Sequence, residues 1–407
     1  MTKRVVVTGM AGISSLGHDW QSFGSALKEG RSGIIAMPEW DRYLDLNTRL
    51  AGPIRDFEIP AHYTRKKTRS MGRVALMATR ASELALEDAG LLGDPILNSG
   101  QVGVAYGSST GSPDAVTDFG SMLIDGDMSN ITATTYIRMM GHTTPVNIGV
   151  FFGLRGILIP TSSACTSASQ GIGFAYERIK YGQQVAMVAG GAEELCPTEA
   201  AVFDTLYATS TRNDAPTTTP APFDKDRDGL VIGEGAGTLV LEEREHALAR
   251  GAHIYAELVG FANNSDGGHV TQPNKDTMQT AMELALKDAK LDASAIGYVN
   301  AHGTATDRGD IAESNATATV LGRVPFSSLK GNIGHTLGAC GALEAWAGIQ
   351  MMNESWVAPT LNLKTPDELC GDLDYIIGST RTLEFEYLMS NNFAFGGINT
   401  SIIFKRV

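Results

Sequence analysis

The feature that most constrains the fold is an internal repeat. Residues 83–91 (ELALEDAGL) resemble residues 283–291 (ELALKDAKL), which lie 200 positions later. A short loop and then an apolar segment, at 102–106 and 296–300, follow each copy, and each apolar segment runs into a turn of small residues. Because the same order recurs in both halves, the repeat predicts a duplicated fold whose halves meet near Arg250.

The pattern between the repeats predicts the class of each half. Short apolar segments alternate with segments of helical composition, which is typical of an α/β protein whose strands are buried on both faces. No linker rich in Pro or Ser interrupts the chain near the boundary, so we expect residues 1–250 and 251–407 to form one rigid body. The predicted strands lie at 5–8 (ending at Gly9), 101–106, 157–159 and 185–189, and a helix is predicted at 73–89.

Composition excludes several classes of protein. The net charge is −13, so a general nucleic-acid binder is not expected. The four cysteines form no CxxC pair, which favours a reducing compartment. The chain contains neither a signal-like N-terminal segment nor a run of about 18 apolar residues, so we expect a cytoplasmic protein without a membrane span.

Cys165 is the strongest candidate for chemistry. The predicted strand at 157–159 ends at Pro160, small residues turn the chain, and a helical stripe of apolar residues follows. This places Cys165 near a helix N-terminus, where free amides and the helix dipole favour the thiolate. The alternative is a buried structural cysteine, which suits the other three better: Cys196, Cys340 and Cys370.

Two histidines have similar surroundings. His302 follows an apolar strand and precedes Gly303, and His335 follows Gly334 and precedes a helix rich in Gly and Ala. A neutral imidazole in such a place can donate Nε2–H to a developing oxyanion or accept a proton. Each alone is an ordinary loop histidine, so the prediction rests on their joint occurrence with Cys165.

Three further segments have both a functional and a purely structural interpretation. The turn at 390–399 presents the amide of Phe395, which together with that of Cys165 would form an oxyanion hole; a plain hairpin turn is the alternative. The basic run at 65–69 is either a solvated face or a docking site for an acidic partner. The segment 224–229 resembles a calcium loop, but Gly235 stands where the bidentate Glu should be, so no metal is predicted.

Several long motifs, in the right order, identify a family resemblance that spans the chain. They include SSACTSASQGIG around Cys165, YVNAHGTATDRGD around His302, SLKGNIGHTLGACGALEAW around His335 and SNNFAFGGIN around Phe395. The chain resembles an elongating β-ketoacyl-acyl-carrier-protein synthase. The resemblance implies an α/β thiolase fold, with duplicated halves in five layers α-β-α-β-α, and a homodimer; a heterodimer with a homologous subunit stays open.

The resemblance also implies an activity. This is the decarboxylative condensation of malonyl-carrier with an acyl group held on Cys165, in fatty acid or polyketide and aryl-polyene synthesis. His302 and His335 would serve decarboxylation, Lys330 and Glu344 would tune the site, and Phe395 would be the gatekeeper. No metal or redox cofactor is implied, because the thioester already activates both carbons; the phosphopantetheine arm arrives on the acyl carrier protein. The resemblance further implies substrate contacts at Thr304, Thr306, Phe203 and Thr110, and carrier docking at Arg65, Lys66 and Arg69.

Departures from the family pattern leave some points open. Ala394 and Ile398 replace the Gly and Thr that are more common around the last motif, and Thr110 replaces a bulky apolar residue, which leaves acyl length and polarity undetermined. A degradative thiolase would need a second cysteine in that last glycine loop. Starter-unit enzymes pair Cys with His and Asn. The remaining alternative, a non-catalytic chain-length partner of a synthase heterodimer, would typically lack the nucleophilic cysteine.

Overall fold

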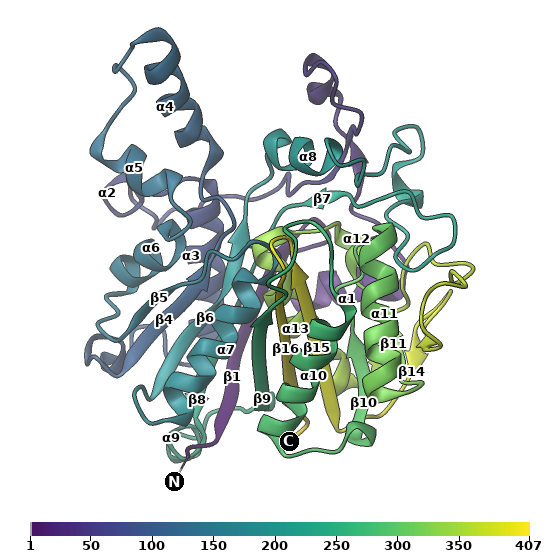
Figure 1. Ribbon diagram of the computed structural model, residues 1–407. Helices are drawn as coiled ribbons and strands as arrows, with labels where there is room; N and C mark the ends of the chain where they lie inside the picture. The colour runs from purple at the N-terminus through teal and green to yellow at the C-terminus, as the bar shows by residue number, and fades with distance from the viewer. Residues whose placement is uncertain (1) are drawn as a thin grey trace.

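Two halves with the same strand order make up the computed structural model, which describes residues 2–407 (Figure 1). The first half has the spatial order β5 (Leu158–Pro160), β4 (Val102–Gly107), β6 (Ala186–Glu193), β8 (Gly235–Glu243) and β1 (Val5–Ser14). The second half mirrors it with β9 (Ala256–Ser265), β16 (Ile398–Lys405), β15 (Tyr387–Ala394), β10 (Ile296–Asn300) and β11 (Pro325–Ser327), and β13 (Asp374–Tyr375) adds an edge.

The strand directions confirm the duplication. β4 pairs in parallel with β5 and β6, just as β10 pairs in parallel with β11 and β15. β8 pairs antiparallel with β6 and β1, just as β16 pairs antiparallel with β15 and β9, and the added edge strand β13 pairs in parallel with β11. The two sheets join where Val5–Val7 of β1 pairs with residues 256–258 of β9, a ladder of only three residue pairs.

The helices complete five layers. On the outer faces, α3 (Arg73–Asp88) covers β1, β8 and β6, while α10 (Lys275–Ala289) covers β9 and β16 and also contacts α11 (Asp307–Leu321). Between the halves, α7 (Ser167–Lys180) lies on β4 and β6, and α13 (Cys340–Glu354) lies on β8 and β15; the two helices contact each other (Figure 1). The predicted order α-β-α-β-α is therefore confirmed, and both repeat copies begin in the outer helices.

The first strand was predicted too short. β1 continues past Gly9 to Ser14, and its register with β8 shifts between Val7 and Gly9, so the glycine forms a bulge rather than the end of the strand. A Cβ on Gly9 would lie 2.2 Å from the carbonyl oxygen of Ala85 in α3. The glycine is therefore needed because helix and strand approach closely at this point, which the sequence alone did not reveal.

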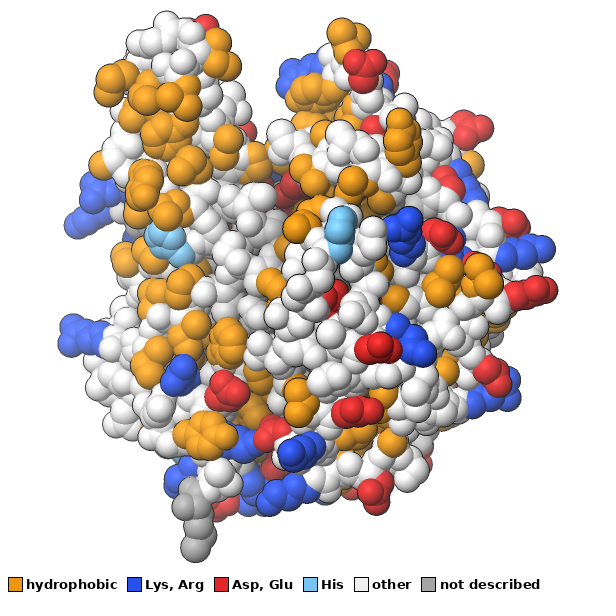
Figure 2. All heavy atoms as spheres, viewed as in Figure 1, with side chains coloured by type: hydrophobic (Ala, Val, Ile, Leu, Met, Phe, Trp, Pro, Cys, Tyr) orange, Lys and Arg blue, Asp and Glu red, His pale blue; other side chains and the backbone are white. Residues whose placement is uncertain are grey.

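Part of the segment between β4 and β5 stands away from the layers. It contains α4 (Pro113–Asp125), α5 (Ala133–Met139) and α6 (Thr143–Phe152); α6 packs on α3 and β4, whereas α4 projects at the upper left of Figure 1. Hydrophobic side chains gather on the same projection in Figure 2. The shorter elements are α1 (Trp20–Lys28), α2 (Arg65–Thr68), α8 (Pro197–Asp204), α9 (Arg244–Ala249), α12 (Lys330–Ile333), β2 (Ile35–Ala36), β3 (Leu50–Gly52), β7 (Ile232–Gly233), β12 (Trp356–Val357), β14 (Arg381–Thr382), and the 3-10 turns η1 (Pro38–Arg42), η2 (Pro95–Asn98), η3 (Ala164–Thr166), η4 (Pro216–Thr218), η5 (Ala293–Ala295) and η6 (Leu337–Ala339).

Arg250, where the halves were predicted to meet, lies between α9 and β9; a domain boundary there stays a prediction.

Within residues 2–407, no helix combines the length and the hydrophobicity that crossing a bilayer requires.

Candidate active site

Cys165 lies in the middle layer, at a sharp turn between β5 and α7. It belongs to η3, and Ala164 before it has a positive φ of 50°, an uncommon conformation for a residue with a side chain. The thiol is only 3% exposed and faces the backbone amides of Phe395 and of Cys165 itself. Burial raises the pKa of Cys165 to about 11, although these amides and Lys330 oppose the rise. Desolvation therefore works against the thiolate that the helix terminus was expected to stabilise.

His335 contacts the cysteine. Its Nε2 lies 3.0 Å from Sγ of Cys165, and its Nδ1 accepts a hydrogen bond from the amide of Leu337 at 3.3 Å. Because Nδ1 is an acceptor, the neutral ring carries its proton on Nε2. The His335 backbone is held by its own amide, which donates to the carbonyl of Val231 at 2.7 Å.

His302 lies beside it, at the end of β10. Its Nδ1 is 3.3 Å from Nζ of Lys330, and its ring centroid is 5.1 Å from that of His335 at an interplanar angle of 85°. An ammonium group can only donate, so Nδ1 of His302 is the acceptor and Nε2 again carries the proton. Burial, with the nearby charge of Lys330, lowers the pKa of both histidines well below the usual value. Both are neutral rings with an Nε2–H donor near neutral pH.

A buried ion pair supports His302 from behind. Nζ of Lys330 lies 2.5 Å from Oε1 of Glu344, and both side chains are 1% exposed. Burial by itself would lower the pKa of Lys330, but the Glu344 carboxylate reverses this and raises it. Nδ2 of Asn392 donates to Oε2 of Glu344 at 2.6 Å and also lies 3.4 Å from Nδ1 of His302. Sequence reasoning missed Asn392, although it stands within the motif around Phe395.

Glu313 is a second residue that sequence reasoning missed. Its two carboxylate oxygens accept the amides of His302 and Gly303, each at 2.7 Å, and so fix the turn that carries the imidazole. Burial raises the pKa of Glu313 to about 8, against the effect of these two amides. The residue lies on α11, whose carboxylates accept amides of the segment that follows β10, and no spacing pattern in the sequence indicated this contact.

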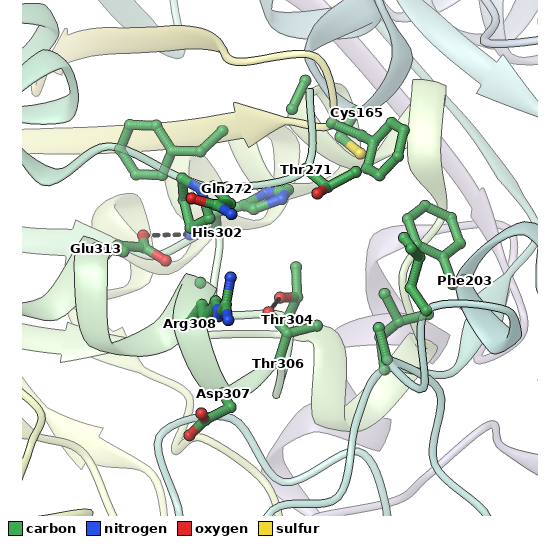
Figure 3. Close-up of a pocket in the computed structure, with 18 of the residues that line it drawn as sticks. Cys165, Phe203, Thr271, Gln272, His302, Thr304, Thr306, Asp307, Arg308 and Glu313 are labelled. Atoms are coloured by element: carbon green, nitrogen blue, oxygen red, sulfur yellow. Dashed lines mark hydrogen bonds between the residues drawn. The ribbon is translucent and has the colours of Figure 1, made fainter. Parts of the chain in front are cut away.

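The cysteine and the two histidines border one cavity of about 640 Å³. Cys165, His302 and His335 line it, and so do Phe395 and the predicted substrate contacts Phe203, Thr304 and Thr306. Figure 3 shows Phe203 near Cys165, and it shows Thr304 and Thr306 next to each other on the segment between β10 and α11.

Contacts between side chains organise this cavity. The rings of Phe203 and Phe395 meet edge to face with centroids 5.8 Å apart, and the hydroxyls of Thr304 and Thr306 are 2.9 Å apart. The Phe395 turn joins β15 to β16 and is followed by Gly396 and Gly397, both with positive φ. The segment is thus a hairpin turn, as the alternative proposed, and it also presents its amide to the thiol.

Besides the buried pair Lys330 and Glu344 behind His302, four predicted residues lie outside the cavity lining. Thr110 is exposed on the loop after β4, where its hydroxyl lies 3.3 Å from Oε1 of Glu199. Arg65, Lys66 and Arg69 are exposed on and just after α2. The structure therefore does not bring these residues to the cysteine, and a role for them has to operate at the surface.

The donor atoms of Cys165, His302 and His335 lie within 4.8 Å of one another, as metal ligands would, and so do those of His302, Cys340 and Glu344. The Lys330 ammonium lies against His302 and Glu344, so it would repel a cation there. The thiol is also protonated at neutral pH, and thiol coordination requires the thiolate. The chemistry of these groups suits oxyanion stabilisation better than metal binding.

Known proteins are similar to this chain over its whole length. Residues 2–247 match the family model described as the β-ketoacyl synthase N-terminal domain, and residues 255–364 match the C-terminal domain of that synthase. A 3-oxoacyl-[acyl-carrier-protein] synthase 2 of Vibrio harveyi is 40% identical over 413 residues, which cover 100% of this chain and 99% of the relative.

Solved structures agree. A β-ketoacyl synthase from Burkholderia phymatum has a TM-score of 0.98 and 62% identity, with both chains covered in full. A type II polyketide synthase ketosynthase, solved with its acyl-carrier protein, has a TM-score of 0.89 and 30% identity, again with full coverage of both chains. The fold is thus a thiolase-like ketosynthase fold. The chain belongs to the β-ketoacyl synthase family.

Proposed function

We propose that this chain is a 3-oxoacyl-acyl-carrier-protein synthase, an acyltransferase that condenses malonyl-carrier with an acyl group held on Cys165. The observation that supports this most is the convergence of a buried thiol, two Nε2–H donors and two backbone amides in one cavity. In this proposal the nucleophile belongs to residues 1–250 and both histidines to residues 251–407.

The first half-reaction is acyl transfer. The thioester carbonyl would enter the hole formed by the amides of Cys165 and Phe395, where its oxygen gains negative charge as sulfur attacks. The new bond joins the acyl carbon to Sγ, the carbon–sulfur bond to the arm breaks, and the thiol proton ends on the departing pantetheine sulfur. Because the pKa of the thiol is about 11, His335, 3.0 Å away, would help by donating to the sulfur as its proton leaves.

The second half-reaction is decarboxylative condensation. The malonyl carboxylate would leave as CO₂, and the electron pair of the broken bond becomes an enolate. Nε2–H of His302 and of His335 would stabilise the enolate oxygen, since preorganised donors act strongly in a dry site. The enolate carbon then attacks the acyl carbon, the bond to Sγ breaks, and Cys165 regains a proton. Lys330, held by Glu344, would orient His302, and its charge would help to keep both rings neutral.

Phe203, Phe395, Thr304 and Thr306 are the proposed substrate contacts. The two aromatic rings stand beside the thiol, where the acyl chain begins, so their edge-to-face contact would act as a gate. The paired threonine hydroxyls offer hydrogen bonds to the amides of the pantetheine arm. Thr110, outside the cavity, is proposed to affect the acyl chain only through its contact with Glu199.

The proposed protein partners are an acidic acyl carrier protein and a second copy of the chain. Arg65, Lys66 and Arg69 carry exposed positive charge in a protein of net charge −13, which suits an acidic partner. For the dimer, the support is the outer edge of β5, which has no strand partner in residues 2–407, and the apolar surface of the projecting segment that contains α4 and α5. That surface includes exposed Val116, Leu123, Ile124, Met128 and Tyr136.

A condensation assay tests the function. Purified protein would receive malonyl-carrier and a panel of acyl-carriers of different length and unsaturation, with Cys165→Ala as control, and mass spectrometry would follow the acyl-enzyme and the 3-oxoacyl product. We expect both species with the native chain and neither with the variant. An absence of acyl-enzyme for every carrier would overturn the proposal and favour the chain-length partner instead.

A further inference from the structure

The rim of the active-site cavity contains one cation that the reaction described above does not use. Arg308 lines the cavity together with Thr304 and Thr306, from the first turn of α11. Figure 3 shows its side chain beside Thr304, away from Cys165. Its guanidinium is exposed and makes no hydrogen bond or ion pair with any residue in 2–407. An arginine without a partner at the mouth of a cavity is available for an anion.

The other charged side chains of the cavity wall all have partners, which for Asp266 and Glu313 are neutral hydrogen-bond donors. Arg227 is 2% exposed at its side chain and binds Asp307 at 3.0 Å. Asp228 lies 3.4 Å from Arg212, and Asp266 accepts from Nδ2 of Asn399 at 2.8 Å. Glu313, the fourth acid of the wall, accepts hydrogen bonds from the backbone amides of His302 and Gly303. The positive charge that remains uncompensated on the wall is therefore that of Arg308.

We propose that Arg308 binds the phosphate of the carrier's phosphopantetheine arm. The inference rests on the proposed function, in which the thiol end of the arm reaches Cys165 past Thr304 and Thr306. The phosphate at the other end then lies at the cavity mouth, where it carries negative charge. Arginine suits it because its planar fork donates two parallel hydrogen bonds to phosphate oxygens. Arg308 would thereby set the depth at which the arm stops.

Equilibrium binding tests this without catalysis. Calorimetry would compare 4′-phosphopantetheine with pantetheine, which lacks the phosphate, on the native chain, Arg308→Gln and Arg308→Lys. We expect the native chain to prefer the phosphorylated ligand by on the order of tenfold, Arg308→Gln to lose the preference and Arg308→Lys to keep part of it. Arg323→Gln is the matched control, because this exposed arginine follows the opposite end of α11. A preference that survives in Arg308→Gln, or none in the native chain, overturns the proposal.

Kinetics separate this inference from the proposed function. With acyl-4′-phosphopantetheine, Arg308→Gln should raise KM for acylation of Cys165 and leave kcat unchanged, and the effect should shrink as salt rises. With acyl-pantetheine, the substitution should change neither constant. A phosphate preference in binding without any acylation would support the Arg308 site and refute the synthase function. Acylation without a phosphate preference would support the synthase function and refute the Arg308 site. If Arg308→Gln impaired acyl-coenzyme A but left acyl-carrier unaffected, the assignment to the carrier would be wrong.

Discussion

The two helices of the middle layer begin in the same way and carry different chemistry. Before α7, the turn η3 contains Ala164 with φ 50°, and before α13, the turn η6 contains Leu337 with φ 44°. One residue after each of these comes Cys165 in the first half and Gly338 in the second. Duplication thus supplied the same helix-opening turn twice, and only one copy holds a nucleophile.

The difference follows from what surrounds each turn. The amide of Gly338 donates to Oε2 of Glu193 at 2.9 Å, and a Cβ on the glycine would lie 2.7 Å from that oxygen and 2.9 Å from the amide nitrogen of Ser109. Around Cys165, by contrast, the wall opens into the cavity. One copy of the turn is therefore closed by packing from the first half, and the other is open to substrate.

The largest expected effect is a loss of activity on substitution of Cys165, but not of Cys340. Cys165→Ala should abolish acyl-enzyme formation and lower condensation by more than about 10³-fold, because no other group attacks the thioester. Cys340→Ala, at the start of α13, should keep both, since Sγ of Cys340 donates to the carbonyl of Cys165 at 3.2 Å and accepts from Nδ2 of Asn392 at 3.6 Å but does not line the cavity. Intact-protein mass spectrometry after incubation with acyl-carrier measures this. An acylated Cys165→Ala protein would refute the assignment.

The two histidines should differ in which step they affect. His302→Ala should slow malonyl decarboxylation by roughly 10²- to 10³-fold, the usual cost of losing an oxyanion donor, and leave acyl transfer nearly intact. His335→Ala should slow both, because Nε2 of His335 contacts Sγ of Cys165. CO₂ release and acyl-enzyme formation would be timed separately, with exposed His253→Ala as control. Equal effects of both variants on acyl transfer would contradict this assignment of the two histidines to different steps.

A pH series tests whether burial or the helix terminus controls the thiol. Because burial raises the pKa of Cys165 to about 11, the thiolate fraction should grow about tenfold for each pH unit from 7 to 10. Iodoacetamide labelling of Cys165, followed by peptide mass spectrometry, should accelerate in proportion. A labelling rate that levels off near pH 7 would show instead that the amides and the dipole dominate.

The smallest effect concerns the closed turn. Gly338→Ala should lower the free energy of unfolding by about 1–3 kcal/mol, because the new methyl group has no room beside Glu193. Gly149→Ala is the matched control: its Cβ would meet Leu158 at an ordinary 3.7 Å within α6, so alanine should be neutral or slightly stabilising. Urea denaturation measures both. An unchanged free energy of unfolding in Gly338→Ala would mean that the turn can accommodate a side chain.

Much of the fold and site could be predicted from local patterns. The repeat at 83–91 and 283–291 predicted the duplication, and the motifs singled out Cys165, His302 and His335 before any contact was known. Glu313 and Asn392 were missed, because a carboxylate or an amide is defined as a partner only when another element brings a donor to it. The bulge at Gly9 was missed for the same reason: its cause lies in α3.

By itself, the sequence determined the strand and helix order, the turns of small residues and the residue types available for chemistry, since these depend on periodicity and side-chain identity. The tertiary structure decided their electrostatics. A helix terminus predicted a stabilised thiolate at Cys165, yet burial raises its pKa, and burial with Lys330 keeps His302 and His335 neutral. Desolvation depends on everything packed around a group, so it is a property of the assembled layers and not of any local segment.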